Sequence, residues 1–193
     1  MNRIDAILDY WFGGGPDMKK WYGANAETDA FILETFGDDI RAACAGELDA
    51  WADTARGRIA LVIVLDQFTR NIFRDSAKCY DADPKAQQLV VEGLANGHAD
   101  ELSDLEHSFL LMPLMHAEDI ALQDRCVECF AALAARAAPG PGRDYIEASA
   151  KFAHNHRDTV AKFGRFPHRN ALLGRETTPQ EAEFLDKGRF GDG

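Results

Sequence analysis

The stretch from Ile59 to Leu65 reads IALVIVL, and it is the longest apolar run in the chain. Its β-branched residues would suit a buried strand, but a parallel strand needs partner strands. We find no second candidate strand in the sequence. The run therefore predicts a helix that is apolar on all sides, at the centre of an all-α fold.

The flanking sequence carries amphipathic helical patterns that are separated by short turns. We expect about seven to nine helices in a single domain over residues 1–193, with only the last few residues frayed. Asp83 and Pro84 predict a helix start, with Asp83 as the N-cap and the proline at the first position. Pro113 lacks an N–H, so it predicts a break or a kink between helices over 103–112 and 117–136.

The charge balance limits the classes of partner. The 193 residues include 21 Lys and Arg against 32 Asp and Glu, a formal net charge of -11. Nucleic acids and anionic membranes need a broad cationic surface, so neither is expected as the main partner. The N-terminus has no signal-peptide character, and seven apolar residues are too few for a bilayer span of about 20. We expect a cytoplasmic protein.

Cofactor motifs are missing from the sequence. Cys126 and Cys129 form a CxxC, but no second CxxC exists and no strand precedes it, so packed thiols are expected. No Walker-type or dinucleotide glycine fingerprint is present, and no cofactor is predicted.

Two polar segments stand in apolar settings. Asp66, Gln67, Arg70 and Asn71 follow the apolar run, and Asp66 and Arg70 are four residues apart, so they can pair on one helical face. Charges near a buried helix are costly unless they are paired.

The second polar segment follows Pro113 and contains His116, Glu118 and Asp119. If a helix restarts near residue 114, His116 and Asp119 lie on the same face of it. Glu118 and Asp119 would then lie in its first turn, where the helix dipole favours acidic side chains. Both segments are consistent with a structural ion pair or cap, or with a pocket wall.

The third polar segment, residues 150–176, is basic. It contains six Lys and Arg and two acids, a net charge of +4, so the rest of the chain carries -15. Such segregation suits a local anion site in an acidic protein, and it equally suits a segment that neutralises the acids of the other two segments and holds the helices together. Phe166 and Pro167 break the helix, so His168, Arg169 and Asn170 would stand at the start of a short new helix, where free backbone N–H groups favour anions.

Three blocks of the chain together suggest a family. VLDQFTRNIFR (64–74), LLMPLMHAEDI (110–120) and FGRFPHRNALLGRETTPQEAEFL (163–185), in this order, resemble the signature blocks of an uncharacterised bacterial family. That family is described as all-helical and similar to tetratricopeptide repeat proteins in its superhelical arrangement. Thr69 stands where a proline is expected and Met115 where an acid is expected. The resemblance implies a superhelical stack around one central buried helix, and it implies no activity, substrate or catalytic residue.

Three interpretations remain open. The first is a binding module that recognises a small anionic ligand or a peptide carboxylate, because guanidinium groups pair bidentately with such groups. Its candidate ligand-binding residues are Asp66, Gln67, Arg70, Asn71, His116, Arg165, His168, Arg169 and Asn170.

The second interpretation is an enzyme that uses the same pocket, with a histidine base and an orienting carboxylate. Its catalytic candidates are His116, Asp119, His154 and Asp158. A metal-dependent hydrolytic variant would use His116, Glu118, His154 and Asp158, but these spacings are individually weak and no metal is predicted. The third interpretation is a polar network with a purely structural role. The sequence does not determine the oligomeric state.

Overall fold

The computed structural model describes residues 2–23 and 25–188, which form helices and turns without a strand. The α-helices are α1 (Arg3–Phe12), α2 (Met18–Tyr22), α3 (Ala26–Ala45), α4 (Ala55–Val62), α5 (Thr69–Ile72), α6 (Asp83–Ala95), α7 (Asp104–Met115), α8 (Ile120–Arg136), α9 (Pro141–Phe163) and α10 (Pro179–Asp186). Eight of them have eight or more residues in this part of the chain, within the expected range. The all-α prediction is confirmed. The predicted fraying at the C-terminal end lies outside the described residues.

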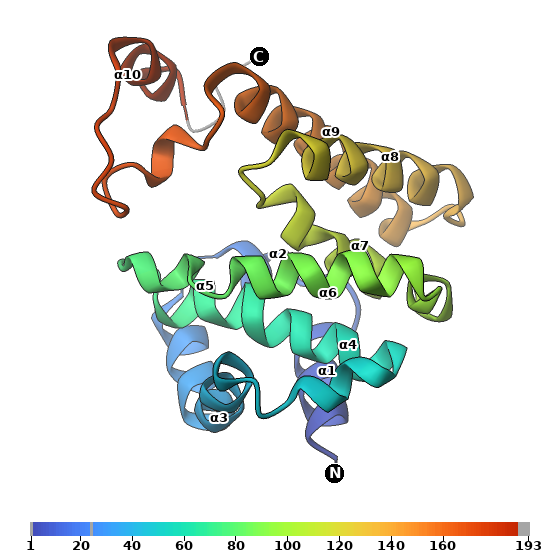
Figure 1. The fold of residues 1–193 in the computed structure, drawn as a ribbon. Coiled ribbons are helices and arrows are strands. Elements are labelled where there is room, and N and C mark those ends of the chain that lie inside the picture. Colours follow the sequence, from blue (N-terminus) through green and yellow to red (C-terminus); the bar gives the residue numbers. More distant parts are fainter. Residues whose placement is uncertain (1, 24, 189–193) are drawn as a thin grey trace.

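The central helix is built from three consecutive segments. α4, the π-helical segment η2 (Ile63–Phe68) and α5 follow one another without a break, because the junction residues Ile63 and Thr69 keep right-handed helical dihedral angles. Every side chain from Ile59 to Leu65 is fully buried. This helix packs against α1, α3, α6 and α7 (Figure 1). The predicted helix that is apolar on all sides is therefore confirmed.

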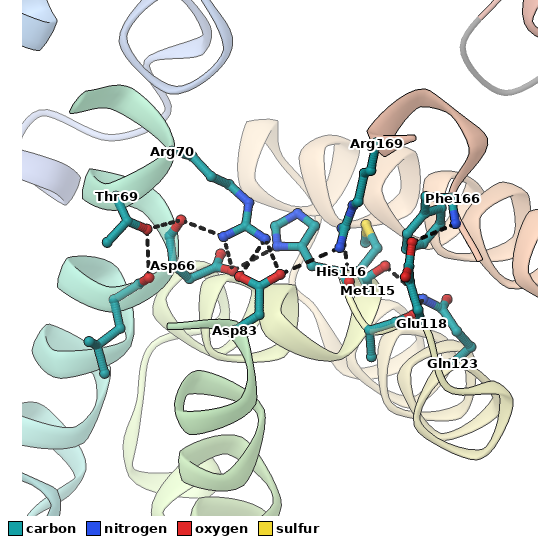
Figure 2. Close-up of polar contacts among 12 residues, drawn as sticks. Asp66, Thr69, Arg70, Asp83, Met115, His116, Glu118, Gln123, Phe166 and Arg169 are labelled. Carbon is teal, nitrogen blue, oxygen red and sulfur yellow. Dashed lines mark hydrogen bonds and ion pairs between the residues drawn. The ribbon is translucent and has the colours of Figure 1, made fainter. Parts of the chain in front are cut away.

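The π-helical segment widens the central helix where its polar residues begin. The Leu65 carbonyl accepts a hydrogen bond from Thr69 Oγ1 at 2.6 Å, and the Asp66 carbonyl accepts one from Arg70 Nη1 at 2.9 Å (Figure 2). Side chains thus bond to carbonyls of the wide turn. Single π-turns within α-helices are often found at functional sites.

The core is continuous around this helix. Trp11 of α1 stands edge-on to Phe68 and to Phe109 of α7, with ring centroids 5.5 and 6.0 Å apart. α8 and α9 pack as an antiparallel pair beyond α7 (Figure 1). Buried Cys126 belongs to this core and Cys129 packs against it; burial raises the pKa of both thiols. Within residues 2–23 and 25–188, no helix has both the length and the apolar character needed to cross a membrane.

Two predicted helix boundaries are wrong. α7 continues through Pro113 to Met115, because Pro113 lies in the last turn and the surrounding residues are buried against α6, α8 and α9. The N-cap of α6 is Ala82 rather than Asp83, since the Asp83 side chain bonds to Arg70 instead of to the first helical turn. As a result, His116 directly follows α7 and the Asp83 side chain reaches Arg70, and both side chains belong to the candidate site.

Candidate functional site

The Asp66 carboxylate is the centre of the polar cluster. It lies in η2, it is fully buried, and it contacts Arg70 Nη1 at 2.9 Å and His116 Nδ1 at 2.8 Å, with a further hydrogen bond from the Gln67 amide. Burial alone would raise its pKa, but Arg70, His116 and Gln67 favour the charged form and bring the pKa of Asp66 down to about 2. Asp66 is therefore ionised at neutral pH.

His116 follows the last residue of α7 and points its ring at Asp66. Burial lowers its pKa, Arg70 lowers it further, and Asp66 opposes both; the net pKa lies below the usual value of 6.5. The imidazole is therefore neutral at pH 7. Since Nδ1 faces an ionised carboxylate, the hydrogen bond assigns the proton to Nδ1 and leaves Nε2 with its lone pair.

Asp83 is a second buried carboxylate that sequence reasoning did not place in the site. Arg70 bridges the two acids, donating through Nη2 to Asp83 at 2.9 Å while its other terminal nitrogen contacts Asp66 (Figure 2). In the sequence, Asp83 has the pattern of a helix cap. The balance of charges could have indicated Asp83, because two arginines at the site, Arg70 and Arg169, require a second negative charge besides that of Asp66.

Arg169 completes the cluster from the C-terminal segment. Its Nη2 donates to the His116 carbonyl at 2.9 Å and its Nη1 lies 3.5 Å from Asp83 (Figure 2). The guanidinium lies 4.5 Å from the ring centroid of Tyr80 and 4.6 Å from that of Phe166. Its Nε is buried and makes no hydrogen bond within the described residues. One donor of an otherwise well-held side chain is thus unsatisfied.

A cavity of about 640 Å³ adjoins this cluster. Among the nine predicted ligand-binding residues, those in its wall are Gln67, Arg70, Asn71, His116, His168 and Arg169. Asp66 lies behind Arg70 and His116 and does not line it. Among the described residues, the wall contains three arginines and three histidines but no Asp or Glu. The acids therefore lie behind the wall, and the permanently charged side chains that the described residues contribute to it are all arginines.

The other two predicted ligand-binding residues belong to a separate network. Arg165 donates to both carboxylate oxygens of Glu181, at 2.7 and 2.9 Å, and the fully buried Asn170 bonds to Glu181 and Arg175. Arg175 in turn pairs with Glu118 at 2.6 Å. Neither Arg165 nor Asn170 lines the cavity.

Glu118 fixes the basic segment to the loop between α7 and α8. Besides Arg175, it accepts a hydrogen bond from the backbone N–H of Phe166 at 2.8 Å. This anchors the short helix η5 (Pro167–Arg169) and so positions Arg169. Part of the predicted anion site therefore neutralises the protein's own acids.

The remaining catalytic and metal candidates do not converge. Asp119 caps α8 by accepting from the N–H groups of Ala121 and Leu122, so it does not pair with His116. His154 and Asp158 are exposed on α9, where Asp158 contacts Arg157 at 3.4 Å. Over the ranges that the structure describes, no three His, Cys, Asp or Glu side chains are placed to hold a metal ion.

The neutral state of the partly buried His116 predicts a pH dependence of stability. Because the folded-state pKa is lowered, the unfolded chain binds the proton more readily, and the free energy of unfolding should fall as pH drops through about 6.5. His116→Gln should remove this contribution, while that of buried His107, whose pKa burial also lowers, remains. Urea unfolding of both proteins at several pH values measures the difference. Equal pH dependence in the two proteins would show that His116 is not held neutral.

Comparison with known proteins places the chain in a family. Residues 7–189 match the model described as bacterial protein of unknown function (DUF924). A solved structure of a protein of unknown function from Agrobacterium tumefaciens is 39% identical, with a TM-score of 0.85 and an alignment over 96% of this chain and 98% of that chain. Comparison with curated proteins gives no match. The predicted bacterial family and its all-helical fold are confirmed, and the chain belongs to the DUF924 family of bacterial proteins of unknown function.

Proposed function

We propose that the cavity binds a small molecule that carries an anionic group, a carboxylate or a phosphate. The observation that carries the proposal is the wall itself: three arginines, three histidines and no acidic side chain among the described residues, in a chain with a net charge of -11. Each of these arginines is paired with an acid outside the wall, Arg70 with Asp66 and Asp83, Arg169 with Asp83, and Arg74 with Asp29, so the wall offers oriented guanidinium donors rather than a large net charge.

The guanidinium groups are held ready for such a ligand. Asp66 and Asp83 fix Arg70, and Asp83, the His116 carbonyl and two aromatic rings fix Arg169. Each guanidinium carries five N–H donors, more than these contacts use. A pre-organised site loses little conformational entropy when the ligand binds.

The helical scaffold is compatible with this role. Consecutive helices α6, α7, α8 and α9 pack against their neighbours, which supports the superhelical, tetratricopeptide-repeat-like arrangement that the family resemblance implies. In this proposal the cavity lies at one side of the stack, where α2, α7 and α9 meet the Asp66 cluster.

A general-base enzyme is the second candidate, and the Asp66–His116 pair favours it. An ionised buried carboxylate orients a neutral imidazole whose ring lines the cavity, and it would stabilise the imidazolium that proton uptake forms. The Ser149 hydroxyl in the wall donates to the Tyr145 carbonyl, and burial raises the pKa of the Cys79 thiol. Neither suits a nucleophile, so the fitting reaction class is attack by a water that His116 deprotonates.

The binding proposal predicts ligand-dependent stability. Benzoate or phosphate at about 10 mM should raise the melting temperature of the wild-type protein, because a ligand of the folded state stabilises it by mass action. Arg169→Gln should weaken this binding about tenfold or more, the cost of losing a charged hydrogen bond. Calorimetric titration measures the affinities, and Arg169→Lys, which keeps the charge but not the planar fork, should be intermediate.

Arg165→Gln is the matched control. It also breaks an ion pair, with the buried carboxylate of Glu181, but Arg165 lies outside the cavity, so ligand affinity should be unchanged. The binding proposal fails if neither anion stabilises the wild-type protein, or if Arg165→Gln and Arg169→Gln weaken binding equally.

The general-base candidate predicts a reactive His116. Diethyl pyrocarbonate modifies neutral imidazoles, so it should label His116 in the folded protein, and benzoate should slow this reaction. Exposed His154 is the internal reference, since benzoate should leave its labelling unchanged. Peptide mass spectrometry resolves the two sites. A His116 that stays unlabelled until the protein unfolds would rule out the general base.

A further inference from the structure

We infer that the ligand is an amphipathic organic acid, with its anionic group at Arg70 and Arg169 and an aromatic or otherwise apolar body along the opposite part of the wall. This inference rests on the proposed function and deepens it, because it names the chemical class of the ligand. It excludes inorganic phosphate and short-chain acids as the physiological ligand.

The size of the cavity is the first argument. At about 30 Å³ per water molecule in the liquid, 640 Å³ corresponds to about twenty waters. A carboxylate or phosphate group alone would fill a small part of that space. Cavities of this size typically enclose whole organic molecules, with a few polar groups that fix their orientation.

The chemistry of the wall is the second argument. Gln67, Arg70, Asn71 and Arg169 come from η2, α5 and η5, and Arg74 comes from the turn after α5, whereas α2, α7 and α9 contribute Trp21, Tyr22, Met112, Met115, Tyr145 and Phe152. Trp21 and Tyr145 pack with ring centroids 5.4 Å apart, and the hydroxyls of Tyr22 and Tyr145 are hydrogen-bonded at 2.7 Å. Rigid aromatic groups and adaptable methionines suit an apolar body.

The rim of the cavity is the third argument. Met18, Tyr22 and Phe152 line it and are 56%, 52% and 52% exposed. They make up three of the eight large hydrophobic residues that are exposed in the described part of the chain. Apolar surface in contact with water is unfavourable, and a bound apolar body would cover it. A second hollow of about 330 Å³ on α9 shares Phe152 and Ala148 with the cavity, which gives a longer body room beyond the rim.

A series of acids that share one carboxylate tests this inference. Calorimetric titration with acetate, benzoate, 3-phenylpropionate and 2-naphthoate should show affinity rising with apolar size, by about fourfold for each methylene-sized increment that is buried. Phe152→Ser should reduce the affinity for 2-naphthoate several-fold and leave that for acetate unchanged. Phe31→Ser is the matched control, because Phe31 is 45% exposed and lies on α3, away from the cavity.

The outcomes separate this inference from the proposed function. If acetate and 2-naphthoate bind equally well, or if the two phenylalanine variants behave alike, the amphipathic ligand is wrong and the anion site stands. If Phe152→Ser changes the oligomeric state in sedimentation but not the binding of any acid, the rim is a self-association surface and the inference is overturned. If no acid binds, the proposed function itself fails.

Discussion

The site depends on one constraint, a carboxylate that is fully buried inside the central helix of the protein. An ionised group in such a place costs several kcal/mol unless hydrogen bonds and opposite charges compensate for it. Asp66 obtains this compensation from Arg70, His116 and Gln67. Asp66 lies in the π-helical segment η2, and the side chains of Thr69 and Arg70 donate hydrogen bonds to backbone carbonyls of that segment. Removing the carboxylate would leave its partners without the acceptor that orients them.

The cavity wall follows from the way these partners are held. Arg70 and His116 turn one edge to Asp66 and line the cavity with the rest of their side chains. Asp83 repeats the arrangement, since it contacts both Arg70 and Arg169 from behind. Glu118, which accepts hydrogen bonds from Arg175 and from the backbone N–H of Phe166, fixes the segment that carries Arg169. The acids stabilise the fold, and the cationic groups that they hold face the cavity.

Much of the fold and part of the site could be predicted from the sequence. The apolar run IALVIVL specifies a central helix, and the four-residue spacing specifies the pair of Asp66 with Arg70, because both depend on local periodicity. The partner of His116 could not be predicted, since Asp66 lies 50 residues away while Asp119 lies three residues away and caps α8 instead. Two further contacts depend on loop geometry, which the types of side chain alone do not determine. One is the contact of Asp83 with Arg70, and the other is the ion pair of Glu118 with Arg175 rather than with Arg169.

The ionisation of Asp66 tests this account most directly. With ¹³C-labelled aspartate, the carboxyl resonance of Asp66 can be followed as pH falls from neutral towards the usual aspartate pKa of 3.8. The account predicts that Asp66 stays ionised through this range, with a pKa of about 2. If Asp66 is protonated at or above the usual pKa, the carboxylate does not organise Arg70 and His116, and the central claim is contradicted.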